Sequence, residues 1–388
     1  MPLIETIAQS NGKNRAMKNT HFCYASILFF GCQSPAEPND LGASDESVNT
    51  PSDTGITPSP KIQDCLSPAP KSMWGEIIEA PAQTFFSADL SDAVRQGIDA
   101  GLLAAAQAWG NYGPVEYWVL GTDTDAALEL IDCYCERRDA FGQWSHESCV
   151  THHSATDGEH NLMSYLLVGQ QAVEDNIPMG SMGLNGNRDW GIHTFTSSYP
   201  FGFDGIFEYI EAAEETKTVF HEYFHAVQSA HIYTKDYQHR EALMGPTWFV
   251  EGGAEYMADY TTSRMWSDGT LLPTPSSNHP SFEQRMEWRM IGGKENLATH
   301  CPNMAFEDIT YQDPCSYAAY ELGAWAIAYL HATTKPNQLL EVFYPNLEAL
   351  EWETAFETAF GVSPESFYED FDDFLSLSLA DQMAILPN

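Results

Sequence analysis

The chain has 388 residues, 43% of them hydrophobic and 13% aromatic, which is enough to bury a substantial core in one large domain or two ordinary ones. It carries 55 Asp and Glu against 17 Lys and Arg, giving a formal net charge of -38 at pH 7. Such a surface repels phosphate backbones and anionic headgroups, which excludes nucleic acid and electrostatic membrane docking as main partners.

Residues 1–31 have the pattern of an export leader. Read from Met17, which we consider a possible true start, a single Lys precedes a short apolar run that ends in Gly31 and Cys32. The run is too short to span a bilayer. It resembles a bacterial lipoprotein signal, which implies cleavage before Cys32, lipid on that thiol and location in the cell envelope. An ordinary secretory leader, giving a secreted protein, is the alternative.

The segment 32–64 differs sharply in composition from residues 65–388. It is rich in Ser, Pro, Asp and Gly and has no periodic apolar residues, so it cannot bury enough surface to fold. We expect a disordered tether. Globular composition begins at about residue 65 and continues to 388, which defines the folded domain.

The cysteine count fits an exported chain. Of eight cysteines, Cys23 would leave with the leader and Cys32 would carry lipid, which leaves Cys65, Cys133, Cys135, Cys149, Cys301 and Cys315. An even number predicts disulfides, although six cysteines allow 15 pairings. We expect Cys301 to pair with Cys315, because both lie in one Pro-containing loop. The alternative is a thiolate metal site on Cys133, Cys135 and Cys149, which lacks the C-x-x-C spacing of structural zinc.

Apolar spacing in the first part of the domain predicts a helix, a strand, a second helix and a second strand, over 90–110, 115–121, 123–138 and 190–197. Asp123 or Thr124 can cap the second helix. The polar stretch containing His152, His153 and His160 is expected to be an exposed loop rather than a second metal site.

From about residue 205 the pattern is mostly helical, over 206–233, 246–264, 317–333, 337–345, 351–360 and 364–385. There is no internal repeat. The predicted fold class is α+β, with an N-terminal α/β lobe over about 65–204 and a mostly helical lobe over about 205–388.

The stretch HEYFHAVQSAH, residues 221–231, contains an H-E-x-x-H motif. On a helix, His221 and His225 project from one face and can bind the same ion, while Glu222 is placed to hold a water molecule beside it. Chance should produce this motif in such a chain on the order of a few hundredths of a time. The alternative is a helix whose histidines are only core or surface residues.

A zinc site needs a third protein ligand and an open fourth position. His231 stands where metzincins place a third histidine, but Gln228 replaces the Gly at which that helix breaks. In a continuous helix His231 would lie about 15 Å along the axis from His221, out of reach. The other candidate for the third ligand is Glu251, which lies on a predicted second helix that begins near Pro246. Two glycines follow Glu251, and they suggest a close approach of backbones at the metal.

H-E-x-x-H-x-x-Q followed by W-x-x-E-G-x-A-E-Y resembles the peptidase MA-like gluzincin zinc metallopeptidases, distant relatives of thermolysin and of the aminopeptidase N type. The resemblance covers about residues 185–375. It implies a gluzincin-like catalytic domain in which His221, His225 and Glu251 bind Zn²⁺. It also implies that Glu222 is the general base and that Glu255 accepts a hydrogen bond from a ligand histidine.

The segment YELGAWAIAYL, residues 320–330, is similar to the Y-E-x-G-A segment of aminopeptidase N-type enzymes. The similarity implies that Tyr320, with Tyr317 in reserve, donates a hydrogen bond to the oxyanion. The chain lacks the G-x-M-E-N element that binds a substrate amino terminus in those exopeptidases, and its spacing from His225 to Glu251 is longer.

The sequence therefore predicts a zinc-dependent endopeptidase acting on peptide or protein substrates, with no contact to the membrane except a lipid anchor. The strand at 190–197 is either an ordinary sheet strand or the edge with which an extended substrate pairs. Two alternatives remain. One is a non-catalytic surface lipoprotein, for adhesion or scaffolding, on a gluzincin fold; the other is a metzincin-type site that uses His231.

Overall fold

The computed structural model describes residues 65–68, 74–158, 161–175, 181–187, 190–198, 212–271, 280–335 and 337–387. The leader, Cys32 and the expected tether all lie outside these residues. None of the helices in the described part of the chain is both long enough and apolar enough to cross a membrane.

One four-stranded sheet holds the strands β1 (Gln83–Phe86), β2 (Val115–Leu120), β3 (Ser181–Asn187) and β4 (Ile192–Ser198), in the order β1-β2-β4-β3. The first, second and fourth strands run parallel, and β3 runs antiparallel to β4 at the edge. Of the two alternatives for the 190–197 strand, the ordinary sheet strand is confirmed and the sheet edge is wrong, because β4 pairs on both sides. The edge position belongs to β3.

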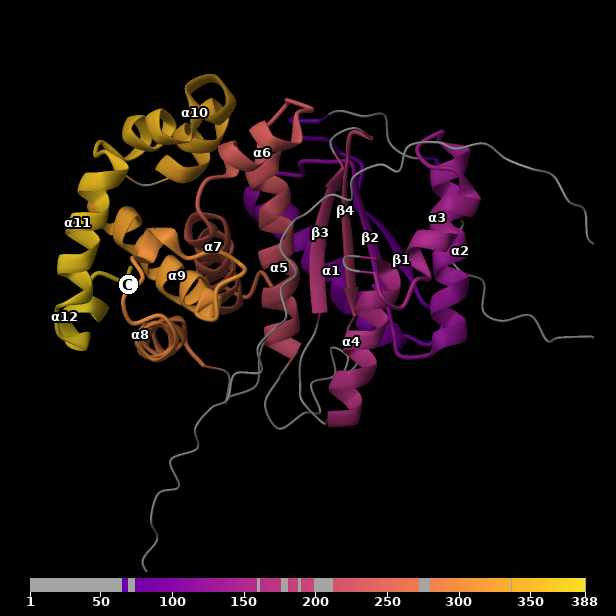
Figure 1. Cartoon of the computed structure of the whole chain (residues 1–388), viewed down its shortest axis with the longest axis horizontal. Helices are drawn as coiled ribbons and strands as arrows, with labels where there is room; N and C mark the ends of the chain where they lie inside the picture. Colours follow the sequence, from indigo (N-terminus) through magenta and orange to yellow (C-terminus); the bar gives the residue numbers. More distant parts are fainter. Residues whose placement is uncertain are drawn as a thin grey trace, which may run out of the picture.

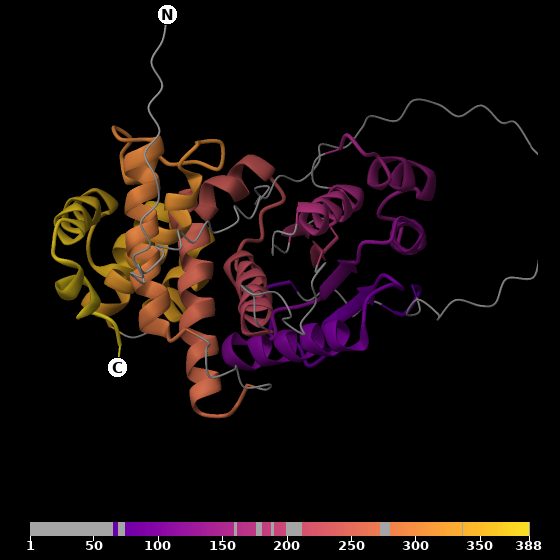
Figure 2. The ribbon, with the colours of Figure 1, turned by 90° about the horizontal axis from the view of Figure 1, so that it is seen from below.

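Helices cover both faces of the sheet (Figures 1 and 2). Successive strand residues point to opposite faces, so Tyr117 and Val119 contribute to one core and Trp118 and Leu120 to the other. The first core includes residues of α1 (Asp92–Trp109) and α5 (Ala212–Ser229) and continues beyond α5 into the helical part of the domain. The second is closed by α2 (Thr124–Ala140), α3 (His146–His153) and α4 (Leu162–Asp175).

The remaining helices pack on the far side of α5 from the sheet (Figure 1). They are α6 (Tyr237–Met244), α7 (Thr247–Ser267), α8 (Phe282–His300), α9 (Ser316–Thr333), α10 (Tyr344–Phe360), α11 (Pro364–Leu375) and α12 (Leu379–Met383), with the short turns η1 (Phe306–Asp308) and η2 (Leu339–Phe343). The helix α5 packs against α1 on one side and α7 on the other. It therefore joins the sheet to the helical part. Mixed helix and sheet of this kind agrees with the predicted α+β class.

Most predicted elements are confirmed, and Asp123 caps α2 by accepting a hydrogen bond from the Ala126 amide at 2.8 Å. Residues 206–211 of one predicted helix lie outside the described part. The predicted 337–345 helix is a π-helical turn that continues into α10, and Glu351, with φ of 63°, marks where that helix kinks. The predicted 364–385 helix is two helices, because Ser378 starts α12 with its own cap.

Six cysteines form three disulfides, Cys65–Cys133, Cys135–Cys149 and Cys301–Cys315. The expected pair is confirmed. The alternative thiolate metal site is wrong, since all three of its cysteines are oxidised. His152 and His153, expected in an exposed loop, lie on α3 with His153 buried, and His160 lies outside the described residues.

His193 on β4 is fully buried, with its ring stacked on Trp74 at a centroid distance of 4.2 Å. Neither ring nitrogen has a hydrogen-bond partner among the described residues. Burial lowers the pKa of His193 to about 3. Burial, together with His152 and Arg138, also holds the pKa of His153 well below its usual value.

These histidines should make the fold acid-sensitive. The unfolded chain binds protons at a pKa of about 6.5, while the folded state stays neutral until about pH 3, so stability is lost as pH falls through this window. At pH 5 the low pKa of His193 should reduce the free energy of unfolding by about 2 kcal/mol relative to neutral pH. Urea unfolding should be measured at pH 7 and pH 5 for the wild type and for His193→Phe. The decrease in the free energy of unfolding between the two pH values should be about 2 kcal/mol smaller in the variant. The exposed His300→Gln is the control and should lose as much stability as the wild type between pH 7 and pH 5. An equal decrease in wild type and His193→Phe, or a reduced decrease in His300→Gln, would contradict this account.

Candidate metal centre

The helix α5 presents two histidines to α7. Its apolar residues, including Val219, Phe220 and Phe224, fill the core on the sheet side. The Tyr223 hydroxyl donates to the carbonyl of Gly110, at the end of α1, at 2.7 Å, which fixes the rotation of α5. His221 and His225, one turn apart, are both buried.

The helix α7 presents two glutamates to α5. It begins after Pro246, and Glu251 and Glu255 lie one turn apart, both buried. A Cβ on Gly252 would lie 2.1 Å from the carbonyl carbon of Gly323 on α9, so these two helices cross with backbone against backbone. The two glycines were expected to mark a close approach of backbones at the metal. The close approach in the structure is instead between Gly252 and Gly323 on α9, and it holds α7 in place.

His221, His225 and Glu251 converge on one point and form a group that could hold a metal ion. The two Nε2 atoms are 3.2 Å apart, and Glu251 Oε2 lies 3.4 Å from His221 Nε2 and 3.5 Å from His225 Nε2. An ion with bonds of about 2.0–2.1 Å and tetrahedral angles would separate its ligand atoms by about 3.3–3.4 Å. The donor triangle therefore has the size of one face of such a tetrahedron.

Glu255 orients the first histidine. Its Oε1 lies 3.0 Å from His221 Nδ1, so a metal-bound His221 would keep its proton on Nδ1 and offer the Nε2 lone pair to the ion. Its Oε2 accepts from Lys217 on α5 and Arg289 on α8. The role that the resemblance implied for this carboxylate agrees with its position.

Gln228 orients the second histidine. Its Oε1 lies 2.7 Å from His225 Nδ1, and its Nε2 donates to the carbonyl of Val250 at 2.8 Å. The two contacts fix the amide orientation, because Nε2 can only donate and Oε1 can only accept. Val250 directly precedes Glu251, so one side chain ties both ligand helices together.

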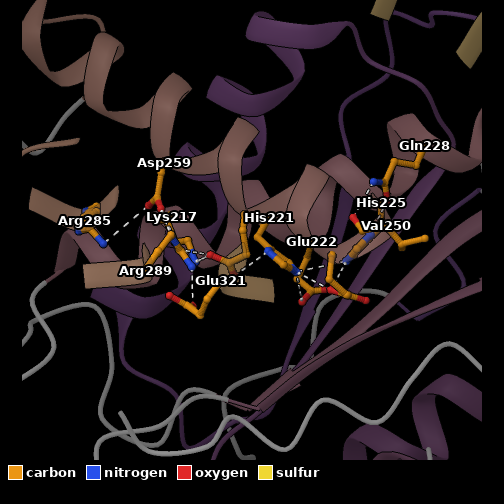
Figure 3. Close-up of polar contacts among 12 residues, drawn as sticks. Lys217, His221, Glu222, His225, Gln228, Val250, Asp259, Arg285, Arg289 and Glu321 are labelled. Atoms are coloured by element: carbon orange, nitrogen blue, oxygen red, sulfur yellow. Dashed lines mark hydrogen bonds and ion pairs between the residues drawn. The ribbon is translucent and has the colours of Figure 1, made fainter. Parts of the chain in front are cut away.

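Behind Glu255 lies a buried charge network (Figure 3). Arg289 donates to Asp259 at 2.9 Å and to Glu321 at 2.6 Å, besides its contact with Glu255. Arg285 lies 3.7 Å from Asp259. The network of Lys217, Arg285 and Arg289 with Glu255, Asp259 and Glu321 balances its formal charges. Because each buried charge has a partner, the network can hold Glu255 rigidly.

The ligand pocket itself attracts positive charge. Burial alone would lower the pKa of His221, but Glu255, Glu251 and Glu222 together raise that pKa to about 9. Burial would raise the pKa of Glu251, but His225 and His221 lower it to about 2. The donor set is thus an anionic cavity, which suits a bound cation.

Glu222 lies beside the donor triangle and outside it. Its Oε1 is 4.0 Å from His221 Nε2 and has no hydrogen-bond partner within the described part of the chain. Burial raises the pKa of Glu222 above its ordinary value. A buried carboxylate oxygen with no partner in the described residues is free to bind a water molecule held at the metal position.

The tyrosines were predicted only in part. Tyr320 is buried and Tyr317 half-buried, both on α9. The oxyanion role of Tyr320 or Tyr317 stays a prediction, and a tyrosine that was not predicted, Tyr311, donates its hydroxyl to Glu251 Oε1 at 2.7 Å from the loop before α9. The sequence reasoning also missed Lys217, Gln228, Arg285, Arg289, Asp259 and Glu321. Helical spacing offered a signal for Gln228, three residues after His225, for Lys217, four before His221, and for Asp259, four after Glu255.

His231 lies beyond the end of α5, and its ring packs edge-on against Tyr112 with centroids 5.4 Å apart. It is outside the group of converging donors found in the described chain. The third position of the triangle belongs to Glu251. No family model, no curated protein and no solved structure matches this chain.

Proposed function

We propose that this protein is a zinc-dependent peptidase with a gluzincin-like catalytic domain, made of an N-terminal α/β lobe and a mostly helical C-terminal lobe. The observation that carries the proposal is the donor triangle of His221, His225 and Glu251, with edges of 3.2, 3.4 and 3.5 Å. Two imidazoles and one carboxylate suit zinc, whereas Mg²⁺ and Ca²⁺ take oxygen ligands. Three protein donors leave a fourth position open, as in catalytic zinc sites.

Bound zinc would supply a water molecule with a lowered pKa and would polarise the scissile carbonyl. Glu222 Oε1 would take a proton from the attacking water. The same carboxyl then gives the proton to the departing amine as the C–N bond breaks. This acid–base help is typically worth about 10²- to 10⁴-fold. The geometric support for this role is Glu222 Oε1, which lies beside the donors and has no hydrogen-bond partner among the residues that the structure describes.

Substrate binding is proposed at the sheet edge. The antiparallel edge strand β3 packs next to α5, and an extended peptide can add a strand to such an edge. In this proposal β3, and not the 190–197 strand, is the edge with which an extended substrate pairs. Tyr320 is proposed to stabilise the oxyanion from α9, with Tyr317 in reserve. The partner is a peptide or protein substrate, cleaved internally.

The proposed location is outside the cytoplasmic membrane. Three disulfides are typical of an oxidising compartment, and they support export. Lipid attachment through Cys32 would tether the domain to the cell envelope by way of residues 32–64.

Metal analysis tests the site directly. The purified protein should retain one zinc ion per chain after dialysis, and Glu251→Ala should lose it, because two imidazoles alone leave the site without its carboxylate. The exposed Glu295→Ala is the matched control and should keep the metal. Zinc retained by Glu251→Ala but lost from His231→Ala would support a metzincin-type site. A wild-type protein without zinc, folded and stable, would support the non-catalytic alternative.

A further inference from the structure

Residues 302–314 form a loop that is closed by the Cys301–Cys315 disulfide and carries Tyr311. This loop connects the end of α8 to the start of α9. The Tyr311 hydroxyl donates to Glu251 Oε1 at 2.7 Å. The other oxygen of the same carboxylate, Oε2, faces the two histidine Nε2 atoms at 3.4 and 3.5 Å. The two oxygens of Glu251 therefore have separate neighbours.

The loop is anchored along its whole length. Its two ends are joined by the disulfide, and Phe306 in its middle is buried against Trp248, with ring centroids 5.3 Å apart. Tyr311 follows Thr310 in a tight turn, in which the Asp313 carboxylate accepts from the Thr310 amide and hydroxyl, each at 2.8 Å. Such anchoring removes much of the conformational freedom that Tyr311 would otherwise lose when it meets Glu251.

We propose that Tyr311 is a positioning residue that occupies Glu251 Oε1, so that this glutamate offers the metal Oε2 alone. The proposal rests on the proposed zinc site and adds to it a group from outside the two ligand helices. Glu251 is buried, so without the hydroxyl its Oε1 would have to find another partner. A metal held by Oε2 would supply such a partner, and the carboxylate would then turn to present both oxygens.

The direct test is Tyr311→Phe, which removes one oxygen and keeps the ring. Zinc affinity, measured by competition with a chelator, should fall about 10- to 100-fold. With Co²⁺ in place of Zn²⁺, the visible absorption should lose intensity relative to wild type, because a second carboxylate oxygen raises the coordination number. Circular dichroism should be unchanged. Gln312→Ala, an exposed neighbour in the same loop, is the control and should behave as wild type.

The disulfides supply a second, matched comparison. Cys301–Cys315 and Cys135–Cys149 both close loops with a sequence separation of 14 residues, so their entropic contributions to stability should be similar. Replacing both cysteines by serine should weaken zinc binding only in the Cys301/Cys315 variant, because only that loop holds Tyr311. Equal zinc affinity in the two double variants would mean that the closed loop does not position Tyr311.

The outcomes separate this inference from the proposed function. If wild-type protein binds no zinc, or binds it equally after Glu251→Ala, the metal site fails and the role of Tyr311 fails with it. If wild type binds one zinc through Glu251, while Tyr311→Phe keeps wild-type affinity and the wild-type Co²⁺ spectrum, only the positioning role is overturned.

Discussion

Glu222→Gln should abolish peptide hydrolysis while leaving the zinc content unchanged. The amide has nearly the same shape as the carboxylate but cannot accept the proton of the attacking water, so a rate loss of about 10²- to 10⁴-fold is expected. Metal retention is expected because Glu222 lies outside the donor triangle, with its Oε1 4.0 Å from His221 Nε2. A proteome-derived peptide library would first identify a cleavable sequence, and initial rates on that peptide would then compare the variants.

The exposed Glu295→Gln makes the same chemical change away from the site and should keep the full rate. Hydrolysis at the wild-type rate by zinc-loaded Glu222→Gln would rule out the proposed mechanism. A variant that lost both zinc and activity would show that Glu222 supports the metal, which the geometry does not predict.

Gly252→Ala should destabilise the fold by about 3 kcal/mol or more, at the upper end of the cost of overpacking. The new Cβ would lie 2.1 Å from the carbonyl carbon and 2.4 Å from the Cα of Gly323. These are backbone atoms within a helix, so they cannot rotate away, and α7 and α9 would have to separate. Since α7 carries Glu251, zinc binding should weaken as well. Urea unfolding and chelator competition measure the two effects.

Gly292→Ala on α8 is the matched control. Its Cβ would find its nearest neighbour, an atom of the Tyr317 ring, at 3.9 Å, which is ordinary contact. Alanine is favoured over glycine in a helix by about 1 kcal/mol, so this variant should be as stable as wild type or more stable. Equal stability of the Gly252 and Gly292 variants would show that α7 and α9 can separate at little cost.

The donor triangle could be predicted because its members obey helical spacing. His221 and His225 lie one turn apart on one helix, and Glu251 and Glu255 lie one turn apart on another, so each pair must share a face. Three long helices of the C-terminal part, α5, α7 and α9, were predicted for the same reason. The predicted end of α10 at Phe360 and the predicted start of α11 at Pro364 agree with the structure, because Gly361 and Ser363 mark them in the sequence.

The parts that were missed lack such periodicity. The helix α8 buries Arg285 and Arg289, so its inner face looks like a solvated one in the sequence. The edge strand β3 contains two glycines and two asparagines in seven residues, which is typical of a loop. Tyr311 comes from an irregular segment, where spacing carries no information about direction. Long-range pairing and tertiary burial, rather than local preference, decide all three.

Five basic side chains of the described chain are buried: Arg137, Arg138, Lys217, Arg285 and Arg289. With only 17 Lys and Arg in all, the molecule keeps a large share of its cations inside, where they neutralise carboxylates beneath the sheet and behind the histidines. Six carboxylates of the described chain are buried as well, so burial leaves the net charge at the surface almost unchanged and raises the ratio of acidic to basic side chains there. Five of the 17 Lys and Arg side chains thus join interior layers of the molecule instead of solubilising it.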